Sequence, residues 1–294
     1  MNKHILLTGG TGAIGSRLAA ALTRRGYQLT ILSHRKLEFD DEEKPQYVQA
    51  DITDARALAD ALRVVSFDVV IHLAGVTHAH DNERYFEVNT EGTKNVLAAC
   101  EEKTISRFIY ISSRVAGEHA GAYARSKLFA EEAVRNSNFP WVIVRPSEVY
   151  GGDAREAISS LITIMKRWHV APIIGSGEYR VAPVWVEDVV NAIVSSVERG
   201  HPRKTYTLCG PQEYTYTAMI DMIKNSLNTS VFKLHLPVSF FRILALVSRL
   251  CGSRIFVADQ IERLISDKPT DITEAKRDLG YEPLSFDEGL HKLI

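Results

Sequence analysis

The chain has 294 residues, a formal net charge of -1, 45% hydrophobic and 24% charged residues. This length is enough for a large buried core, and the balanced charge gives no basic stripe of the kind that nucleic acid requires, so we expect no nucleic-acid partner. The three cysteines, Cys100, Cys209 and Cys251, are widely spaced. That spacing favours a reducing, cytoplasmic location over a disulfide framework.

The first half of the chain alternates short β-branched runs with helical patterns. We expect strands at Ile5–Thr8, Gln28–Leu32, Tyr47–Ala50, Val69–Leu73, Phe108–Ser112 and Trp141–Arg145. We expect helices at Ile14–Arg25, Ala55–Leu62, Arg84–Glu102 and Tyr123–Asn136. The strands are almost continuously apolar, which is typical of parallel strands covered on both faces, so the pattern predicts an α/β fold with a Rossmann-type doubly wound parallel sheet.

After Pro146 the segments become more varied and richer in turns. We expect residues 1–150 and 182–209 to form the dinucleotide-binding domain, and residues 151–181 and 210–294 to form a smaller C-terminal substrate lobe. The stretch Pro183–Val197 is predicted as a strand and helix that return to the sheet. Val238–Leu250 is predicted as an amphipathic helix that is too short to cross a bilayer, which takes roughly 20 apolar residues. Packing in the lobe is favoured over membrane contact, and we expect no membrane span.

A glycine fingerprint joins the first strand to the first helix. Gly9 permits a tight turn, Gly12 lets the backbone approach a pyrophosphate, and Gly15 lets the helix pack on the strand. Ala13 and Ile14, where the loop passes into the helix, are candidates for cofactor contact, because a helix N-terminus offers N–H donors to an anion. The alternative is a plain glycine-rich turn, but the strand and helix around it favour a dinucleotide site.

The second and third strands end in residues suited to the adenosine half of a dinucleotide. An acidic residue usually follows the second strand in NAD-specific folds, but here Ser33, His34 and Arg35 follow it. A hydroxyl and cations suit a 2′-phosphate, so NADP(H) is favoured over NAD(H), although a solvated basic turn would look the same. Asp51 and Ile52 are candidates for contacts with adenine, and Asp51 could instead cap the next turn.

The candidate reacting groups are Ser113, Tyr123 and Lys127. Tyr123 and Lys127 are four residues apart, so they share one helical face. A tyrosine has an ordinary pKa near 10, and a neighbouring ammonium would lower the pKa toward neutrality. Ser113 follows the fifth strand, at the sheet edge where ligands of α/β folds bind. Lys127 could also reach the cofactor ribose, and Ser113 could share the substrate oxygen with Tyr123.

These residues occur together with further motifs along nearly the whole chain. The motifs are Thr8–Gly15, Asp51–Asp54, His72–Gly75, Val88–Thr93, Ile111–Ser113, Tyr123–Lys127, Arg145–Gly151, Val186–Val189 and Ala275–Pro283. The set resembles the extended branch of the short-chain dehydrogenase/reductase superfamily, the NAD(P)-dependent epimerases and dehydratases.

The resemblance implies further roles. Leu73, Ala74 and Gly75 would line the cofactor through their backbone, Asn89 would support the active-site network, and Pro146 and Ser147 would lie near the nicotinamide. Arg180, after the Gly175-Ser176-Gly177 turn, would clamp the diphosphate of a nucleotide sugar, because a guanidinium fork holds two oxygens; a surface salt bridge is the alternative. A homodimer through the helices at residues 89–102 and 123–136 is also implied.

Three departures from the family pattern bear on the reaction. The loop from Ser113 to Tyr123 is shorter than in typical sugar epimerases. Arg114 and Val115 replace the Asp-Glu pair of 4,6-dehydratases, which disfavours water elimination. Trp185 stands where many relatives have histidine, and Lys268 is the only stand-in for an arginine expected in the tail.

His72, His78, His80 and Asp81 could suggest a metal site, but His72 belongs to a family motif and the others fall in a polar loop. We expect no metal, and His78 is a candidate at the substrate mouth. The favoured hypothesis is an NADP(H)-linked oxidoreductase or epimerase acting on a hydroxyl or carbonyl carbon of a nucleotide sugar. The alternatives are a reductase of a smaller ketone or aldehyde, and a non-catalytic NADP(H)-binding sensor or assembly protein.

Overall fold

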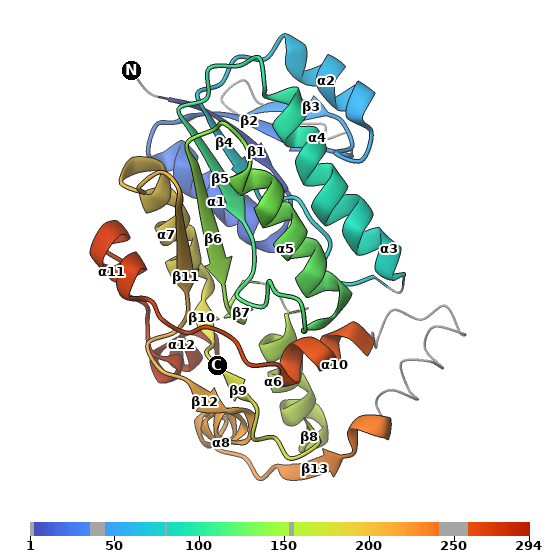
Figure 1. Cartoon of the computed structure of the whole chain (residues 1–294). Helices are drawn as coiled ribbons and strands as arrows, with labels where there is room; N and C mark the ends of the chain where they lie inside the picture. The colour runs from blue at the N-terminus through green and yellow to red at the C-terminus, as the bar shows by residue number, and fades with distance from the viewer. Residues whose placement is uncertain (1–2, 36–44, 80, 153–155, 241–257) are drawn as a thin grey trace.

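A seven-stranded parallel sheet forms the centre of the protein. The computed structural model describes residues 3–35, 45–79, 81–152, 156–240 and 258–294, and Figure 1 shows the sheet lying above a smaller lobe. The strand order is β11-β6-β5-β4-β1-β2-β3. The strands are β1 (His4–Thr8), β2 (Gln28–Ser33), β3 (Gln46–Gln49), β4 (Val69–His72), β5 (Arg107–Ile111), β6 (Trp141–Pro146) and β11 (Lys204–Leu208). The chain reverses its direction of winding between β1 and β4, which is where α/β folds bind ligands.

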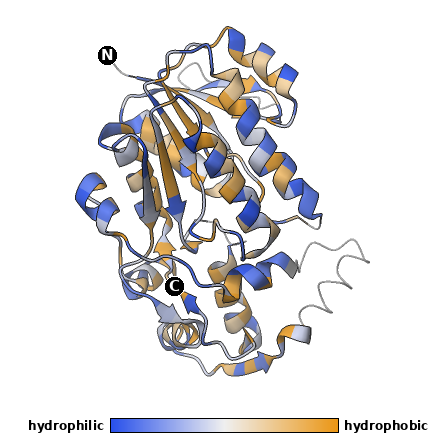
Figure 2. Ribbon diagram, in the orientation of Figure 1, coloured by the Kyte–Doolittle hydropathy of each residue, from blue (hydrophilic) through white to orange (hydrophobic). Residues whose placement is uncertain are grey.

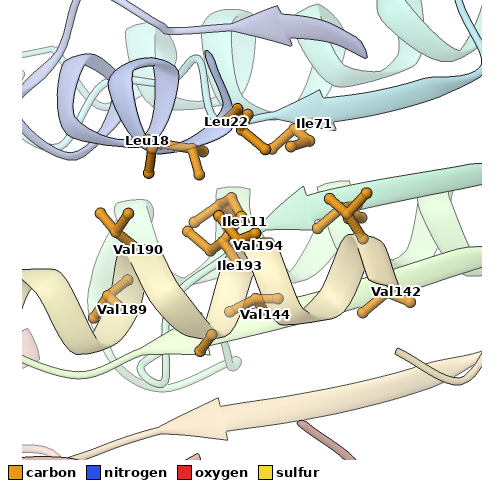
Figure 3. Close-up of a cluster of buried hydrophobic side chains, with 14 of the residues drawn as sticks. Leu18, Leu22, Ile71, Ile111, Val142, Val144, Val189, Val190, Ile193 and Val194 are labelled. Atoms are coloured by element: carbon orange, nitrogen blue, oxygen red, sulfur yellow. The ribbon is translucent and has the colours of Figure 1, made fainter. Parts of the chain in front are cut away.

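Helices α1 (Ala13–Arg24), α7 (Val186–Glu198) and α11 (Thr273–Leu279) cover one face of the sheet. Figure 3 shows Leu18 and Leu22 of α1 and Val190, Ile193 and Val194 of α7 against side chains of β4, β5 and β6. All of these side chains are buried. Removing such a side chain from water contributes about 1.5–3 kcal/mol to folding, so α7 ties a late part of the chain firmly to the sheet.

The other face is covered by α2 (Ala55–Arg63), α4 (Gly92–Ala99) and α5 (Gly121–Arg135). The approach to α4 consists of α3 (Asn82–Tyr85) and a π-helical segment, η1 (Phe86–Glu91). Glu131 anchors α5, because its buried carboxylate accepts hydrogen bonds from Arg145 on β6 and from Arg135 on its own helix. The helix that carries the candidate reacting groups is thereby fixed on the sheet.

The lobe has its own hydrophobic core. It contains α6 (Ala157–Trp168), β8 (Val170–Ile174), α8 (Tyr216–Ser226), β13 (Phe232–Leu236), α10 (Ala258–Ile265) and α12 (Phe286–Leu293). Three two-stranded sheets complete it: β8 with β13, β9 (Arg180–Val181) with β12 (Tyr214–Thr215), and β7 (Val149–Tyr150) with β10 (Val184–Trp185). Within the lobe, α10 is the helix that lies next to α5 (Figure 1).

The predicted fold class is confirmed, with three local differences. The strand expected within Pro183–Val197 is only Val184–Trp185, and it pairs with β7 outside the large sheet. The large sheet gains Lys204–Leu208 at its edge instead, a strand that the sequence interpretation missed. The helix expected at Arg84–Glu102 is divided by the π-helical segment at Phe86–Glu91.

The predicted helix Val238–Leu250 falls mostly outside the described residues, since only its first three residues are placed. Among the described helices, none has the length and hydropathy of a membrane-spanning segment. The boundaries proposed between the dinucleotide-binding domain and the substrate lobe stay a prediction.

Candidate active site

A cavity of about 660 Å³ opens where β1, β4, β5 and β6 end. We call it the central cavity. Its wall includes the glycine turn, the segment after β4, the candidate reacting groups, and Gln260, Arg263 and Leu264 from α10. The sheet supplies one side and the lobe the other. A ligand in this cavity would therefore contact both parts of the chain.

The glycine turn leaves space for a dinucleotide phosphate. A Cβ atom on Gly9 would lie 2.6 Å from the Ala74 backbone nitrogen, and one on Gly15 would lie 2.1 Å from the Gly9 carbonyl oxygen. A Cβ on Gly12 would meet only the Gly9 oxygen, at 3.4 Å. Gly9 and Gly15 are thus needed for close packing, whereas Gly12 faces open space at the N-terminus of α1, which no side chain caps. These residues fit the group that the sequence implies.

The segment after β4 forms the opposite wall of the turn. Leu73, Ala74 and Gly75 line the central cavity. The Ala74 backbone N–H donates to the Thr8 hydroxyl at 3.1 Å, which joins β4 to β1 at the switch point. Gly75 is confined by Asn89, whose Oδ1 would lie 2.8 Å from an added Cβ.

The residues predicted for the adenosine half lie beyond the walls of the central cavity, at the ends of β2 and β3. Ser33 is buried and accepts a hydrogen bond from the Arg35 backbone N–H, while His34 and Arg35 are exposed. Asp51 accepts from the Thr53 backbone N–H at 2.9 Å, so it caps its turn, as the alternative interpretation expected. The Thr53 hydrogen bonds and the nearby His34 hold the pKa of Asp51 below its usual value. Ile52 is buried against Gly92 at the start of α4.

Tyr123 lies in the first turn of α5 and is almost completely buried. The Ser113 side chain, which follows β5, lies beside its phenol, and both residues line the central cavity. Burial raises the pKa of Tyr123, while Arg263 and the Ser113 hydroxyl oppose that rise. Both predicted oxygen-bearing groups therefore meet at the wall of the central cavity.

Lys127 lies one turn further along α5 and also lines the cavity. Its ammonium donates to the Ile111 carbonyl at 2.8 Å and lies 4.5 Å from the centre of the Tyr110 ring. Burial lowers the pKa of Lys127 to about 7. Arg263 and Ser113 lower the pKa of Tyr123 in the structure, and the expected effect of Lys127 on that pKa stays a prediction.

Arg263 on α10 is a site residue that the sequence interpretation missed. Its guanidinium carbon lies 4.4 Å from the centre of the Tyr123 ring, and Nη2 donates to the Thr77 carbonyl at 3.0 Å. Asp259, one turn earlier, pairs with Arg263 at 3.0 Å and accepts from the Tyr123 backbone N–H at 3.2 Å. Gly121 makes room for this contact, since a Cβ there would lie 2.3 Å from Asp259 Oδ1. The lobe thus places an ion pair directly on the candidate acid/base.

Asn89 lies in the π-helical segment and is buried. Its side chain accepts from the Val76 backbone N–H at 2.8 Å and donates to the Ser126 hydroxyl at 3.0 Å. It therefore joins the segment after β4 to α5. A π-bulge of this kind is frequent at functional sites, because it redirects a side chain without ending the helix.

The candidate histidines occupy different environments. His72 is fully buried between the hydroxyls of Thr8 and Thr93, and burial lowers its pKa to about 3, so it stays neutral. His78 lines the central cavity, and burial followed by the charge of Arg263 lowers its pKa. His80 lies outside the described residues. No group of metal-binding side chains occurs in the part of the chain that the structure describes.

A buried cluster of charged side chains adjoins the central cavity, whose wall includes Arg114 and Glu148. Arg114 is 1% exposed and donates through Nη2 to both oxygens of Glu148, at 2.9 and 2.6 Å, and Lys268 lies 3.5 Å from the same carboxylate. Burial alone would raise the pKa of Glu148, but Arg114 and Lys268 hold it below its usual value. Arg114 and Lys268, two departures from the family pattern in the sequence, thus form ion pairs with the same carboxylate, that of Glu148. Neighbouring Pro146 and Ser147 line the cavity, and the Ser147 hydroxyl donates to the Ala182 carbonyl.

Arg180 is not among the residues that line the central cavity. Its side chain is 61% exposed and lies 3.8 Å from Glu213. The diphosphate role of Arg180 stays a prediction. Trp185 packs against the Tyr150 ring. Its indole also covers Gly151, since a Cβ on Gly151 would lie 2.2 Å from it.

The fold and this site together define a class of protein. The sequence model for "NAD dependent epimerase/dehydratase family" matches residues 5–209, and the chain belongs to that family. Among curated relatives, it is 26% identical to a UDP-glucose 4-epimerase from Vibrio cholerae, over 96% of this chain and 92% of the relative. It is 24% identical to an N-acetyl-alpha-D-glucosaminyl-diphospho-ditrans,octacis-undecaprenol 4-epimerase from Escherichia coli O157:H7, over 100% and 95% of the two chains.

Solved structures share the architecture. A UDP-glucuronic acid 4-epimerase from Bacillus cereus, in complex with UDP-glucuronic acid and NAD, superposes with a TM-score of 0.76 at 23% identity. The match covers 98% of this chain and 96% of that one. This similarity extends the agreement in fold from the dinucleotide-binding part to the lobe.

Proposed function

We propose that this protein is an NADP(H)-linked epimerase or oxidoreductase of a nucleotide-activated sugar, exchanging a hydride at a hydroxyl or carbonyl carbon. The observation that carries the proposal is the pairing of Tyr123 with Ser113 in the cavity that the glycine turn also lines. Family membership supports the dinucleotide chemistry, and the named relatives support a nucleotide sugar. The absence of the Asp-Glu pair after Ser113 argues against water elimination.

The residues of the chain divide the acid/base work. A bound nicotinamide dinucleotide supplies the hydride acceptor and donor. Ser113 would hold the reacting oxygen by its hydroxyl, and Tyr123 would take the hydroxyl proton when the carbon is oxidised and return it when the carbonyl is reduced. Arg263 would favour the phenolate because it is a cation held against the ring. Lys127 would bind the cofactor ribose, since its ammonium is already held at the edge of the cavity by Ile111.

The coenzyme preference rests on the end of β2. His34 and Arg35 are exposed there, and the run His34-Arg35-Lys36 directly after the strand contains no carboxylate. A charge-assisted hydrogen bond contributes roughly 1.5–3 kcal/mol, or at least tenfold in affinity. Arg35→Ser should therefore weaken NADP(H) binding by about tenfold or more in calorimetry and leave NAD(H) binding unchanged. Arg24→Ser, at the far end of α1, is the matched control. Tighter binding of NAD(H) than NADP(H) by the unmodified protein would contradict the preference.

We also infer a cytoplasmic homodimer. The proposed contact surface comprises η1, α4 and α5, where the rings of Phe86 and Phe129 lie 5.9 Å apart and Arg125 lies within 6.0 Å of both. These aromatic side chains are half-buried in the single chain. Light scattering of Phe129→Glu should report a monomer if this surface forms the dimer.

The substrate class is tested with purified protein and two panels, one of UDP- and dTDP-hexoses and hexuronic acids and one of small ketones and aldehydes. An epimerase converts a nucleotide sugar without added dinucleotide, whereas a reductase requires stoichiometric NADPH. Ser113→Ala should lower the rate of epimerisation or of reduction, whichever the protein catalyses. The control Ser137→Ala, just after the C-terminal end of α5, should leave that rate unchanged. Reduction of small carbonyls with no conversion of any nucleotide sugar would refute the proposed substrate. Dinucleotide binding with no turnover in either panel would favour the non-catalytic alternative.

A further inference from the structure

The lobe carries a concentration of exposed apolar side chains far from the sheet. Of the large hydrophobic side chains exposed in the described part of the chain, five lie on α6, on β13 or just after it: Ile164, Trp168, Phe232, Leu234 and Phe240. Trp168 is 66% exposed and Phe232 is 68% exposed. Figure 2 shows hydrophobic colour on β13 and α6 at the end of the molecule opposite α2.

The two elements meet at one corner. The backbone N–H of Phe232 donates to the His169 carbonyl at 2.9 Å, directly after Trp168 ends α6. Strand β13 then runs parallel to β8, with Phe232 opposite Val170 and Leu234 opposite Pro172. Because paired residues of neighbouring strands point to the same side of a sheet, one face of this ribbon is apolar throughout. Its members are Val170, Pro172, Ile174, Phe232, Leu234 and Leu236.

The charge of these segments is strongly one-sided. Residues 157–177 contain Lys166 and Arg167 and no aspartate or glutamate. Residues 222–258 contain five lysines and arginines, again with no acidic residue. Three of these five, Arg242, Arg249 and Arg254, lie in residues 241–257, outside the described part of the chain. Since the whole chain has a net charge of -1, the residues outside these two segments are acidic on balance.

We propose that this surface, formed by the end of α6 and the outer face of the β8–β13 ribbon, docks on an anionic lipid bilayer. Tryptophan and phenylalanine enter the boundary between headgroups and acyl chains, while lysine and arginine bind the anionic headgroups. The Arg167 guanidinium lies 5.5 Å from the centre of the Trp168 ring, so an aromatic anchor and a cation occupy the same spot. Neither α6 nor β13 contains a carboxylate, and the nearby Asp221 is paired with Lys233 of β13 at 2.7 Å, which limits repulsion from an anionic surface. The contact is peripheral and needs no membrane span.

Docking would orient the catalytic part of the molecule. Helix α6 begins at Ala157, which lines the central cavity, and ends at Trp168 in the proposed membrane contact. A single helix therefore runs from the cavity to the proposed lipid contact.

The test measures co-sedimentation of the full chain with two kinds of vesicle, phosphatidylcholine alone and phosphatidylcholine mixed with phosphatidylglycerol. The unmodified protein should bind the mixed vesicles, should bind phosphatidylcholine far more weakly, and should be released by high salt. The double variant Trp168→Ser with Phe232→Ser and the double variant Lys166→Glu with Arg167→Glu should each bind at least about tenfold more weakly, because each removes one half of the contact.

The matched control is Val64→Ser combined with Arg56→Glu on and beside α2, where Val64 is 85% exposed. This variant should bind mixed vesicles as the unmodified protein does, and all variants should keep its melting temperature. Failure of the unmodified protein to bind mixed vesicles would overturn the proposal, as would binding that the lobe variants leave intact. A dimer that Trp168→Ser with Phe232→Ser converts to a monomer, without vesicle binding, would assign the surface to a second copy instead. None of these readouts depends on the proposed reaction.

Discussion

Replacing Arg263 by methionine tests how the lobe controls the candidate acid/base. Met keeps most of the side-chain length and removes the charge. The guanidinium lies 4.4 Å from the centre of the Tyr123 ring, which places it about 5 Å from a phenolate oxygen. Two unit charges at about that distance attract by about 3 kcal/mol at an effective dielectric constant near 20. The Asp259 carboxylate beside Arg263 offsets part of this attraction. A net loss of about 1–2 kcal/mol remains, or roughly 5- to 30-fold in the fraction of phenolate at neutral pH.

The assay is kcat/KM for oxidation of the sugar hydroxyl as a function of pH. Loss of the cation raises the pKa of Tyr123, so the acidic limb of the profile should move to higher pH in Arg263→Met and partly return in Arg263→Lys. Asp259→Asn should move the limb the other way, because the carboxylate raises the pKa of Tyr123. Arg63→Met on α2 is the control for removal of an exposed arginine. A uniform fall in rate at every pH would refute the electrostatic reasoning and leave Arg263 with a packing role.

Three further predictions concern stability. Ile193→Ala, in the core between α7 and the sheet, should lower the free energy of unfolding by about 2–5 kcal/mol in urea titration; a change below about 1 kcal/mol would mean that α7 packs loosely. The buried Lys127 has a pKa lowered to about 7, so the unfolded chain binds the extra proton between pH 7 and the ordinary lysine pKa. Stability relative to Lys127→Met should therefore rise with pH across that window, and a flat difference would contradict it. Glu148→Gln leaves Arg114 and Lys268 with no carboxylate between them and should cost about 3–5 kcal/mol, whereas Glu87→Gln, on the surface, should cost under about 1 kcal/mol.

The sequence predicted the parts of the fold that depend on local pattern. Continuous apolar runs such as Val69–His72 identify buried parallel strands, and the glycine turn identifies the switch point, because both signals lie within a few residues. The edge strand Lys204–Leu208 was missed because it is short and alternates polar with apolar residues, as half-covered strands do. The π-helical segment at Asn89 was missed because side-chain bonds to Val76 and Ser126, distant in sequence, accompany it.

In the candidate site too, residues in local motifs could be predicted, whereas residues brought together by distant contacts could not. Ser113, Tyr123 and Lys127 could be named from spacing and order along the chain. Arg263 and Asp259 could not, since the contact with Tyr123 spans some 140 positions and depends on how α10 crosses α5. The Arg114–Glu148–Lys268 cluster likewise joins three segments. One signal was present in the sequence: Arg114 stands where 4,6-dehydratases have an acidic residue, and an arginine that is buried requires a partner of opposite charge.

The most direct measurement is turnover and dinucleotide affinity of Tyr123→Phe. The substitution removes one oxygen and keeps the ring that packs against Tyr85 and Arg263. Loss of a general acid/base commonly slows a reaction by 10²- to 10⁴-fold, so sugar conversion should fall by about that factor while calorimetry shows unchanged NADP(H) binding. Conversion at the rate of the unmodified protein would show that this phenol moves no proton in the reaction.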